Sequence, residues 1–201
     1  MRRVNLSLTS KRGYHPGRPF WYRSLWLVVE ALTLLNPVFV PYGLKSRVLR
    51  AFGAQIGKNV VIKPGIHVKY PWHLTVGDNA WLGERAWIDN FVRVAIGANA
   101  CVSQGAYLCT GNHDWADPGM GLVVKPIIIA EGAWVGAFAR IAPGVTVGEG
   151  AIVALGAVLL KDAEPRGVYV GNPAQKVRER TIRDTPGPAT LHASMSSRKP
   201  K

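Results

Sequence analysis

One histidine stands out among the residues whose type and setting could support chemistry. His113 ends the stretch Leu108-Cys-Thr-Gly-Asn-His, and Asp114-Trp-Ala-Asp-Pro-Gly-Met-Gly121 follows it directly. A free imidazole has a pKa near ~6.5, so at cellular pH it can be neutral and accept a proton from a hydroxyl group. His113 is therefore a candidate general base. The alternative is a structural histidine whose ring is satisfied by a backbone carbonyl.

A repeat of six residues surrounds this histidine. From Ile56 to Glu164 an aliphatic residue opens each unit and a small or aliphatic residue fills its fifth place, as in Val76-Gly-Asp-Asn-Ala-Trp. A period of six fits neither a helix, with 3.6 residues per turn, nor a plain alternation of two. Three units therefore make one triangular coil of a parallel β-helix, and the aliphatic openers point inward. The predicted fold class is an all-β solenoid.

The repeat also predicts where the coils begin and where they are interrupted. The longest interruption spans residues 114–128, and a regular solenoid has no structural reason for it, so function is expected there. Glycines in the second place of a unit, such as Gly77 and Gly97, are expected to relieve backbone strain at the corners. The five coils are expected to begin at Ile56, Val76, Ile96, Ile129 and Val147.

Polar residues near His113 are candidates to hold an acceptor molecule. Asp89 and Asn90 lie on the face of His113 one coil earlier, and Asp114 opens the interruption. Such residues also suit solenoid corners, so for Asp89 and Asn90 both interpretations stay open. No metal site is expected, because His67 and His73 end consecutive units and therefore lie on different faces of the triangle.

Charge is distributed unevenly along the chain, whose formal net charge is +13. Residues 1–55 carry nine Lys and Arg against Glu30 alone, residues 161–201 carry nine against four acids, and residues 56–160 balance, seven against seven. A nucleic-acid groove along the solenoid would concentrate basic residues there, so no nucleic-acid partner is expected. The basic flanks are either solvated tails or surfaces for an anionic membrane.

The cysteines and the start of the chain indicate a location. Cys101 and Cys109 are the only cysteines, and Met1-Arg-Arg leads into polar residues instead of an apolar signal segment. The chain is therefore expected to be reduced and cytoplasmic, with peripheral contact at the inner face of the membrane as an option.

Four segments are expected: a basic arm (1–19), a helical cap (20–55), the β-helix (56–175) with its loop (114–128), and a basic C-terminal segment (176–201). The last part, Thr185 to Lys201, is rich in Pro, Ser and Thr and is expected to be disordered.

The helical cap begins with an amphipathic pattern. Trp21, Leu25, Val28, Leu32 and Leu35 recur at three- and four-residue steps. The apolar run falls short of the ~20 residues that a bilayer requires. We expect this helix to cover the unpaired edge strands at the open end of the solenoid. The alternative, which does not exclude the first, is an interfacial helix in which Trp21, Tyr22 and Trp26 lie beside Arg18 and Arg23.

The residues described so far carry a family resemblance. The six-residue units, Thr110-Gly-Asn-His113, Pro143-Gly-Val-Thr-Val-Gly148 and Gly171-Asn-Pro-Ala174 resemble the hexapeptide-repeat acetyltransferases. Within them the chain is most similar to the colanic acid biosynthesis O-acetyltransferases, and it is also similar to maltose, galactoside and nodulation-factor acetyltransferases. The resemblance implies a left-handed coil, an exception to the usual right-handed crossover. It also implies a homotrimer with active sites between subunits.

The resemblance further implies where acetyl-CoA binds. Three groups of residues follow the cosubstrate from its thioester to its nucleotide: Trp134, Gly136 and Ala137, then Leu155 and Gly156, then Leu160, Lys161 and Arg178. Leu155 and Leu160 stand where relatives often carry small or hydroxyl residues, so any hydrogen bonds to CoA at these places come from the backbone.

The expected function is an acetyl-CoA-dependent O-acetyltransferase that modifies a sugar hydroxyl in exopolysaccharide or surface-glycan biosynthesis. The acceptor is a sugar or a lipid-linked glycan, and no covalent intermediate on Cys109 is expected. Three alternatives stay open at this point: an N-acetyltransferase acting on an amino sugar, a non-catalytic β-helix scaffold, and a carbohydrate-binding protein. A zinc carbonic anhydrase on the same solenoid would need three suitably placed histidines.

Overall fold

The structure is a computed structural model that describes residues 3–9, 13–36 and 40–183. The segment from Thr185 onward, for which we predicted disorder, lies outside the described residues.

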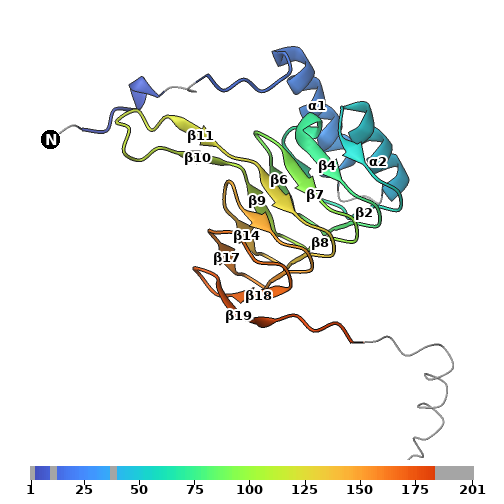
Figure 1. Ribbon diagram of the computed structural model, residues 1–201. Coiled ribbons are helices and arrows are strands. Elements are labelled where there is room, and N and C mark those ends of the chain that lie inside the picture. The colour runs from blue at the N-terminus through green and yellow to red at the C-terminus, as the bar shows by residue number, and fades with distance from the viewer. Residues whose placement is uncertain (1–2, 10–12, 37–39, 184–201) are drawn as a thin grey trace, which may run out of the picture.

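Three parallel sheets form the walls of a triangular coil (Figure 1). The first wall contains β1 (Gln55–Ile56), β4 (Leu74–Val76), β7 (Val94–Ile96), β12 (Ile127–Ile129) and β15 (Thr146–Val147). The second contains β2 (Val61–Ile62), β5 (Trp81–Leu82), β8 (Cys101–Val102), β13 (Trp134–Val135) and β16 (Ile152–Val153). The third contains β3 (His67–Val68), β6 (Trp87–Asp89), β9 (Tyr107–Cys109), β14 (Arg140–Ile141) and β17 (Val158–Leu159).

The register of the first wall confirms the five coil starts. Ile56 pairs with Val76, Val76 with Ile96, Ile96 with Ile129, and Ile129 with Val147. Each residue that opens a unit points inward and is buried, so the openers stack into apolar columns. These observations confirm the expected fold class, an all-β solenoid in the form of a left-handed parallel β-helix with an N-terminal helical cap.

Where glycine fills the second place of a unit, it is required for a different reason from the one we expected. Gly97 does not have a positive φ, but a Cβ added to it would lie 2.6 Å from the backbone nitrogen of Glu131 in the next coil. The close stacking of coils, not corner strain, therefore excludes a side chain there. Left-handed backbone occurs two residues later instead, at Asn59, Asn79 and Asn99, whose amides form a ladder with contacts of 3.2 and 3.3 Å.

Two helices close the N-terminal end of the solenoid: α1 (Phe20–Thr33) and α2 (Tyr42–Ala51). Their buried polar groups bond to backbone groups of the first coil that no preceding coil can satisfy. Trp26 donates its indole N–H to the carbonyl of Val68 (2.8 Å), and the carboxylate of Glu30 accepts the N–H of Val68 (2.6 Å). The ammonium of Lys45 donates to the carbonyl of Ile62 (3.3 Å). The expected cap over the edge strands is therefore present.

The face of α1 that makes this cap is not the apolar stripe of the sequence pattern. Trp26 and Glu30 face the solenoid, whereas the stripe faces outward, with Trp21 and Leu32 each 65% exposed. Tertiary contacts select the side that can bond to the coil edge, and a count of apolar positions does not contain that information. Because Trp26 is buried, it is also unavailable to the interfacial surface that the sequence suggested. No helix among the described residues is long and apolar enough to cross a membrane.

The C-terminal end is closed by strands. β18 (Gly167–Val170) continues the second wall and pairs antiparallel with β19 (Gln175–Glu179), whose side chains are exposed. Lys176 pairs with both Glu164 and Glu179, and these carboxylates hold its pKa above the ordinary value.

The interruption is a β-hairpin that leaves the coil earlier than predicted. β10 (Gly111–His113) pairs antiparallel with β11 (Leu122–Val124), and Ile127 is already back in the first wall. Figure 1 shows this arm projecting from the solenoid toward the N-terminal segment, which contains the short helix η1 (Leu6–Leu8). The N–H of Asn5 donates to the carbonyl of Pro118 near the hairpin tip (2.9 Å). A second short helix, η2 (Pro71–His73), leads into β4.

Candidate active site

The ring of His113 is fixed in one orientation by the hairpin. Its Nδ1 lies 2.7 Å from the carbonyl oxygen of Met120. Since a carbonyl can only accept, Nδ1 carries the hydrogen, and in the neutral ring Nε2 is left with a lone pair. The side chain is exposed on the arm and does not point into a coil corner. The carbonyl contact of the structural alternative is present, and the same contact also produces the tautomer that a general base requires.

A carboxylate holds the carbonyl of Met120 in place. The two oxygens of Asp117 accept the N–H groups of Gly119 and Gly121, each at 3.0 Å, on either side of Met120. Met120 has φ +47°, in the left-handed region that non-glycine residues rarely adopt. The Asp117 contacts therefore stabilise the turn that aims the Met120 carbonyl at His113.

A cavity of about 470 Å³ lies against His113. Asp114, one of the predicted acceptor residues, lines it together with Asn112, Trp115, Lys125 and Leu160. Trp115 is 89% exposed, which is unusual for so large an aromatic residue. The cavity therefore combines a histidine, a carboxylate and an exposed aromatic ring.

Most of the predicted acetyl-CoA residues meet at a second cavity. Trp134, Gly136, Ala137, Leu155 and Arg178 line a space of about 590 Å³ with an otherwise largely apolar wall. Ser103 joins them and accepts the indole N–H of Trp134 (2.8 Å). Such a wall with one basic residue suits a long, flexible chain that ends in phosphates.

The remaining predicted cosubstrate residues lie elsewhere. Lys161 and Leu160 line a cavity of about 370 Å³ beside β19, and Leu160 also lines the His113 cavity. Gly156 is exposed at a corner with φ +66° and lines none of these cavities.

The His113 cavity and the Trp134 cavity share no lining residue. The hairpin leaves the corner between the third and first walls, whereas Ser103, Gly136 and Leu155 lie at the corner between the second and third walls. One chain therefore does not bring the histidine to the wall on which the thioester is expected.

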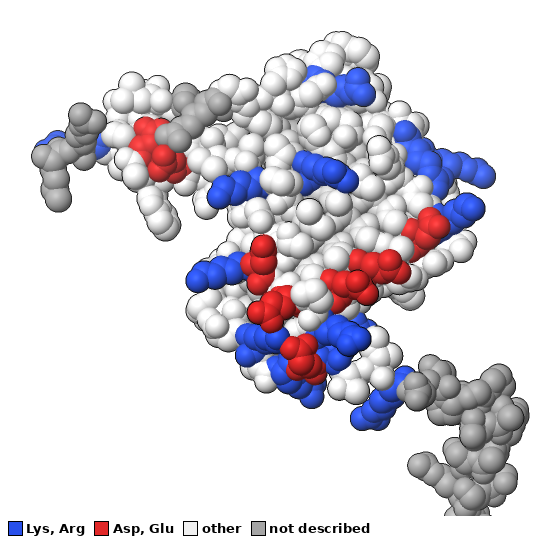
Figure 2. All heavy atoms as spheres, in the orientation of Figure 1, with Lys and Arg blue, Asp and Glu red and all other residues white. Residues whose placement is uncertain are grey.

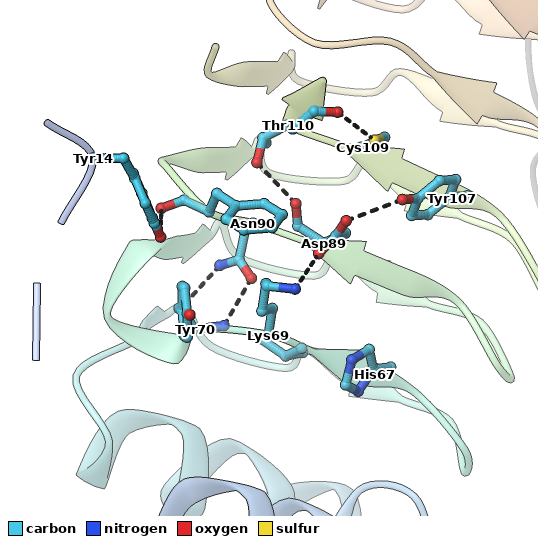
Figure 3. A network of polar contacts seen from close by, with 12 residues as sticks. Tyr14, His67, Lys69, Tyr70, Asp89, Asn90, Tyr107, Cys109 and Thr110 are labelled. Atoms are coloured by element: carbon cyan, nitrogen blue, oxygen red, sulfur yellow. Dashed lines mark hydrogen bonds and ion pairs between the residues drawn. The ribbon is translucent and has the colours of Figure 1, made fainter. Parts of the chain in front are cut away.

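Asp89 ends β6 and Asn90 follows it at the corner, and neither lines the His113 cavity. Figure 3 shows their polar contacts with neighbouring residues of the solenoid. The amide of Asn90 is fully buried and bonds twice to the backbone of Tyr70, at 2.7 and 3.0 Å. Asp89 contacts Lys69 (3.0 Å) and accepts the hydroxyl of Tyr107 (3.0 Å). Burial, together with this carboxylate, raises the pKa of Tyr107. These contacts favour the corner role that the sequence left open.

Thr110 links that corner to the arm. Its hydroxyl donates to the backbone carbonyl of Asp89 (2.8 Å), one residue before the hairpin begins. The thiol of Cys109 donates to the carbonyl of Gly111 (3.0 Å), and no contact with His113 is seen. In the described residues, no cluster of three or more His, Cys, Asp or Glu side chains is placed to hold a metal ion.

Three residues of this site were missed by the sequence analysis: Trp115, Asp117 and Met120. The run Asp117-Pro-Gly-Met-Gly121 contained a usable signal, because an aspartate before closely spaced glycines is typical of a turn held by its own side chain. The role of the Met120 carbonyl left no signal, since every residue has a carbonyl.

Comparison with known proteins identifies the family. Residues 126–161 match the protein-family model described as bacterial transferase hexapeptide (six repeats). The chain is similar to the colanic acid biosynthesis acetyltransferase WcaF of Escherichia coli (strain K12). The two are 41% identical over 156 residues, which cover 78% of this chain and 86% of WcaF. The chain belongs to the hexapeptide-repeat acetyltransferase family.

Solved structures share the fold. A maltose O-acetyltransferase from Clostridium difficile 630 has a TM-score of 0.74 at 23% identity and covers 89% of this chain and 100% of its own. A hexapeptide-repeat acetyltransferase from Vibrio cholerae, solved with acetyl coenzyme A, has a TM-score of 0.71 at 20% identity and covers 80% and 86%. At these identities the likeness establishes the architecture, and the family membership rests on WcaF.

Proposed function

We propose that this acetyltransferase uses acetyl-CoA to acetylate a hydroxyl of a sugar, free or lipid-linked, in the biosynthesis of a surface polysaccharide. The observation that carries the proposal is His113, whose Nε2 is left free by the Nδ1 contact to Met120. The named roles of WcaF in colanic acid biosynthesis and of the maltose enzyme support a sugar acceptor. The cosubstrate is an intracellular thioester, so we place the reaction in the cytoplasm.

The chemistry needs one base and no covalent intermediate on the enzyme. Nε2 of His113 removes the proton from the acceptor hydroxyl as the oxygen attacks the acetyl carbonyl. A C–O bond forms, the C–S bond of the thioester breaks, and the proton passes from the imidazolium to the departing thiolate. Backbone N–H groups stabilise the oxyanion that forms in between.

The cavity beside His113 suits a sugar in size and lining. Trp115 offers a ring face for the apolar side of a pyranose, and Asp114 offers a carboxylate for its hydroxyls. Asp89 and Asn90 act in this proposal through the corner from which the hairpin leaves, because their polar atoms already bond to the protein.

We place acetyl-CoA on the wall formed by Trp134, Gly136, Ala137 and Leu155, with Arg178 near its phosphates. Lys161 and Leu160 then lie toward the nucleotide end, and Gly156 follows at the exposed corner. Since His113 opens onto a different cavity, a complete site requires the histidine of one subunit and this wall of a neighbour. A homotrimer supplies three such sites.

The direct test measures release of the CoA thiol. Purified protein should consume acetyl-CoA only when a sugar acceptor is present, and mass spectrometry should find one acetyl group per product. Sugars with hydroxyls only and amino sugars should be assayed side by side. Turnover confined to the amine would replace O-acetylation by N-acetylation, and a lack of turnover with all glycans would reject the proposed acceptor class.

Mixed trimers test whether each site is shared between subunits. His113→Ala removes the base, and Leu155→Asp places a charge on the exposed cosubstrate wall. Neither variant should be active alone. Trimers co-expressed in equal amounts should recover roughly a quarter of the parent activity, because one site in about four combines both intact residues. If base and wall came from the same chain, mixing would restore nothing.

A further inference from the structure

The outward face of α1 is apolar well beyond what the cap requires. Phe20 is 76% exposed, Leu27 60% and Leu32 65%, and Trp21, Leu25, Val28 and Leu35 extend the same surface. We call these seven residues the cap face. A helix that is apolar on nearly every side occurs in a protein core or against lipid, and α1 lies on the surface.

The capping function does not account for the cap face. Trp26, Glu30 and the carbonyl of Leu34 already bond to the first coils, to Val68 and Gly65. None of the cap-face residues takes part in these bonds. Polar residues at these positions would leave the cap intact. We therefore expect the apolar cap face to bind a partner.

Charge around the cap face identifies the partner. Glu30 is the sole acid in residues 1–55, and it is 1% exposed, facing the solenoid. Arg18, Arg47 and Arg50 are exposed on the same cap. Figure 2 shows blue and white atoms over the helical cap, whereas the red atoms lie along the solenoid below it and at the hairpin tip. An apolar surface at an end of the molecule that carries exposed arginines, and no exposed acid from residues 1–55, complements an anionic lipid surface.

A small basic cavity lies beside the cap face. Arg23 lines a space of about 250 Å³ together with Phe20, Leu27, His67 and Lys69. His67 is paired with Glu30 (2.9 Å) and Lys69 with Asp89 (3.0 Å), but the Nε of Arg23 is buried without a hydrogen-bond partner in the described part of the chain. Arg23 lines the cavity, where its guanidinium can bind an anionic oxygen. The phosphate of a lipid headgroup supplies such an oxygen.

We infer that the cap face is a membrane-docking surface: α1 lies flat in the headgroup region of an anionic bilayer, and Arg23 binds a lipid phosphate. With 14 residues α1 is about 21 Å long, enough for several lipids but not for a span. The surface belongs to each single chain and does not depend on the acetyl transfer. If the protein is the proposed trimer, three caps at the same end of the solenoids bind together, and their effects multiply.

The test is sedimentation of the full-length protein with vesicles of phosphatidylcholine alone or with one third phosphatidylglycerol. Binding should appear with the anionic vesicles at low salt and decline at high salt. The double variant Leu25→Gln, Leu32→Gln should abolish it. Arg23→Gln should weaken it about fivefold, the value of one basic residue at such a surface, ~1 kcal/mol. Ile182→Gln is the matched control, because Ile182 is exposed but lies beyond β19.

Each outcome decides for or against docking. Acetyl transfer to a soluble acceptor and circular dichroism should be the same in all variants, which separates docking from folding and from catalysis. Full-length protein that ignores anionic vesicles at low salt would overturn the inference. So would a double variant that still binds them. If light scattering instead shows an assembly larger than a trimer that the double variant breaks up, the cap face binds a second copy of the chain.

Discussion

The hairpin β10–β11 and the helix α1 are two departures from the same repeat, and they differ in what they expose. The hairpin is organised by polar contacts: Asp117 brackets Met120, and Met120 holds His113. Helix α1 uses its polar groups against the coil and turns apolar side chains outward. The hairpin therefore presents the proposed base in a defined orientation, whereas the helix presents an apolar surface whose side chains have no such fixed orientation.

This difference assigns the proposed catalysis and the proposed membrane docking to separate parts of the molecule. A reactive histidine needs a fixed tautomer and direction, which hydrogen bonds supply. Docking to a fluid surface needs area and charge, which side chains without fixed partners supply. Variants of the hairpin should therefore change turnover and leave vesicle binding unchanged, and variants of the cap face should do the reverse.

The largest effect is expected at the histidine. His113→Ala removes the base, and turnover should fall roughly 10²–10⁴-fold, the usual contribution of general-base catalysis. The side chain is exposed, so unfolding temperature and vesicle binding should match the parent protein. Steady-state thiol release measures the loss.

His15→Ala provides the matched control, since His15 is exposed and its Nδ1 accepts the N–H of Gly17 in the N-terminal segment. It should retain full turnover. Parent-like activity in His113→Ala would reject the mechanism. A loss of vesicle binding in the same variant would contradict the assignment of catalysis and docking to separate regions.

A smaller loss is expected when the bracket around Met120 is removed. Asp117→Ala frees the N–H groups of Gly119 and Gly121, so the carbonyl that orients His113 is no longer fixed. Misplacement of a catalytic group by about an ångström costs up to ~10²-fold, so kcat should fall roughly 10- to 10²-fold while KM for acetyl-CoA changes little.

Two variants distinguish positioning from general damage. Asp117→Asn keeps one accepting oxygen and should recover part of the lost kcat. Asp78→Ala removes a carboxylate that also accepts a backbone N–H, from Lys58, but at a corner remote in sequence from the hairpin. If both alanine variants lower kcat equally, Asp117 has no special connection to His113.

The cosubstrate wall should respond in KM and not in kcat. Arg178→Ala removes the basic residue of the Trp134 cavity, and Lys161→Ala removes one from the neighbouring cavity. Each is exposed, so KM for acetyl-CoA should rise only about 3- to 10-fold. Initial rates at varied acetyl-CoA measure this, with Lys58→Ala as control. An effect confined to the KM of the acceptor would reverse our assignment of the two cavities.

The sequence predicted the solenoid well because the physical cause of the repeat is local. Each coil stacks on the next, so the place of Val76 or Ile129 in the period dictates which way its side chain points. His113 could be selected as a candidate for a related reason: it stands where the period is broken. The corner role of Asn90 stayed undecided, because asparagine serves a turn and a ligand equally well.

The cap face could not be predicted from the pattern. Both sides of α1 contain large apolar residues, and the side that packs is selected by Trp26 and Glu30 meeting the edge at Val68, a contact 38 to 42 residues away in sequence. The same limit applies to Asp117 and Met120. Their contacts with His113 depend on a turn geometry that the residue types permit but do not specify.

The smallest effect is expected at the cysteine of the corner below the arm. Cys109 is the one thiol close in sequence to His113, and an acyl-enzyme mechanism would require the imidazole to activate it. The thiol instead donates to the carbonyl of Gly111 (3.0 Å). Cys109→Ala removes one weak hydrogen bond from a partly buried site, so kcat should stay within about twofold and unfolding should shift by less than ~1 kcal/mol. Quenched-flow analysis with radiolabelled acetyl-CoA should find no label on the protein. If Cys109→Ala were as impaired as His113→Ala, or if label were trapped on Cys109 in the parent protein, direct transfer would be rejected in favour of a two-step mechanism through an acyl-enzyme.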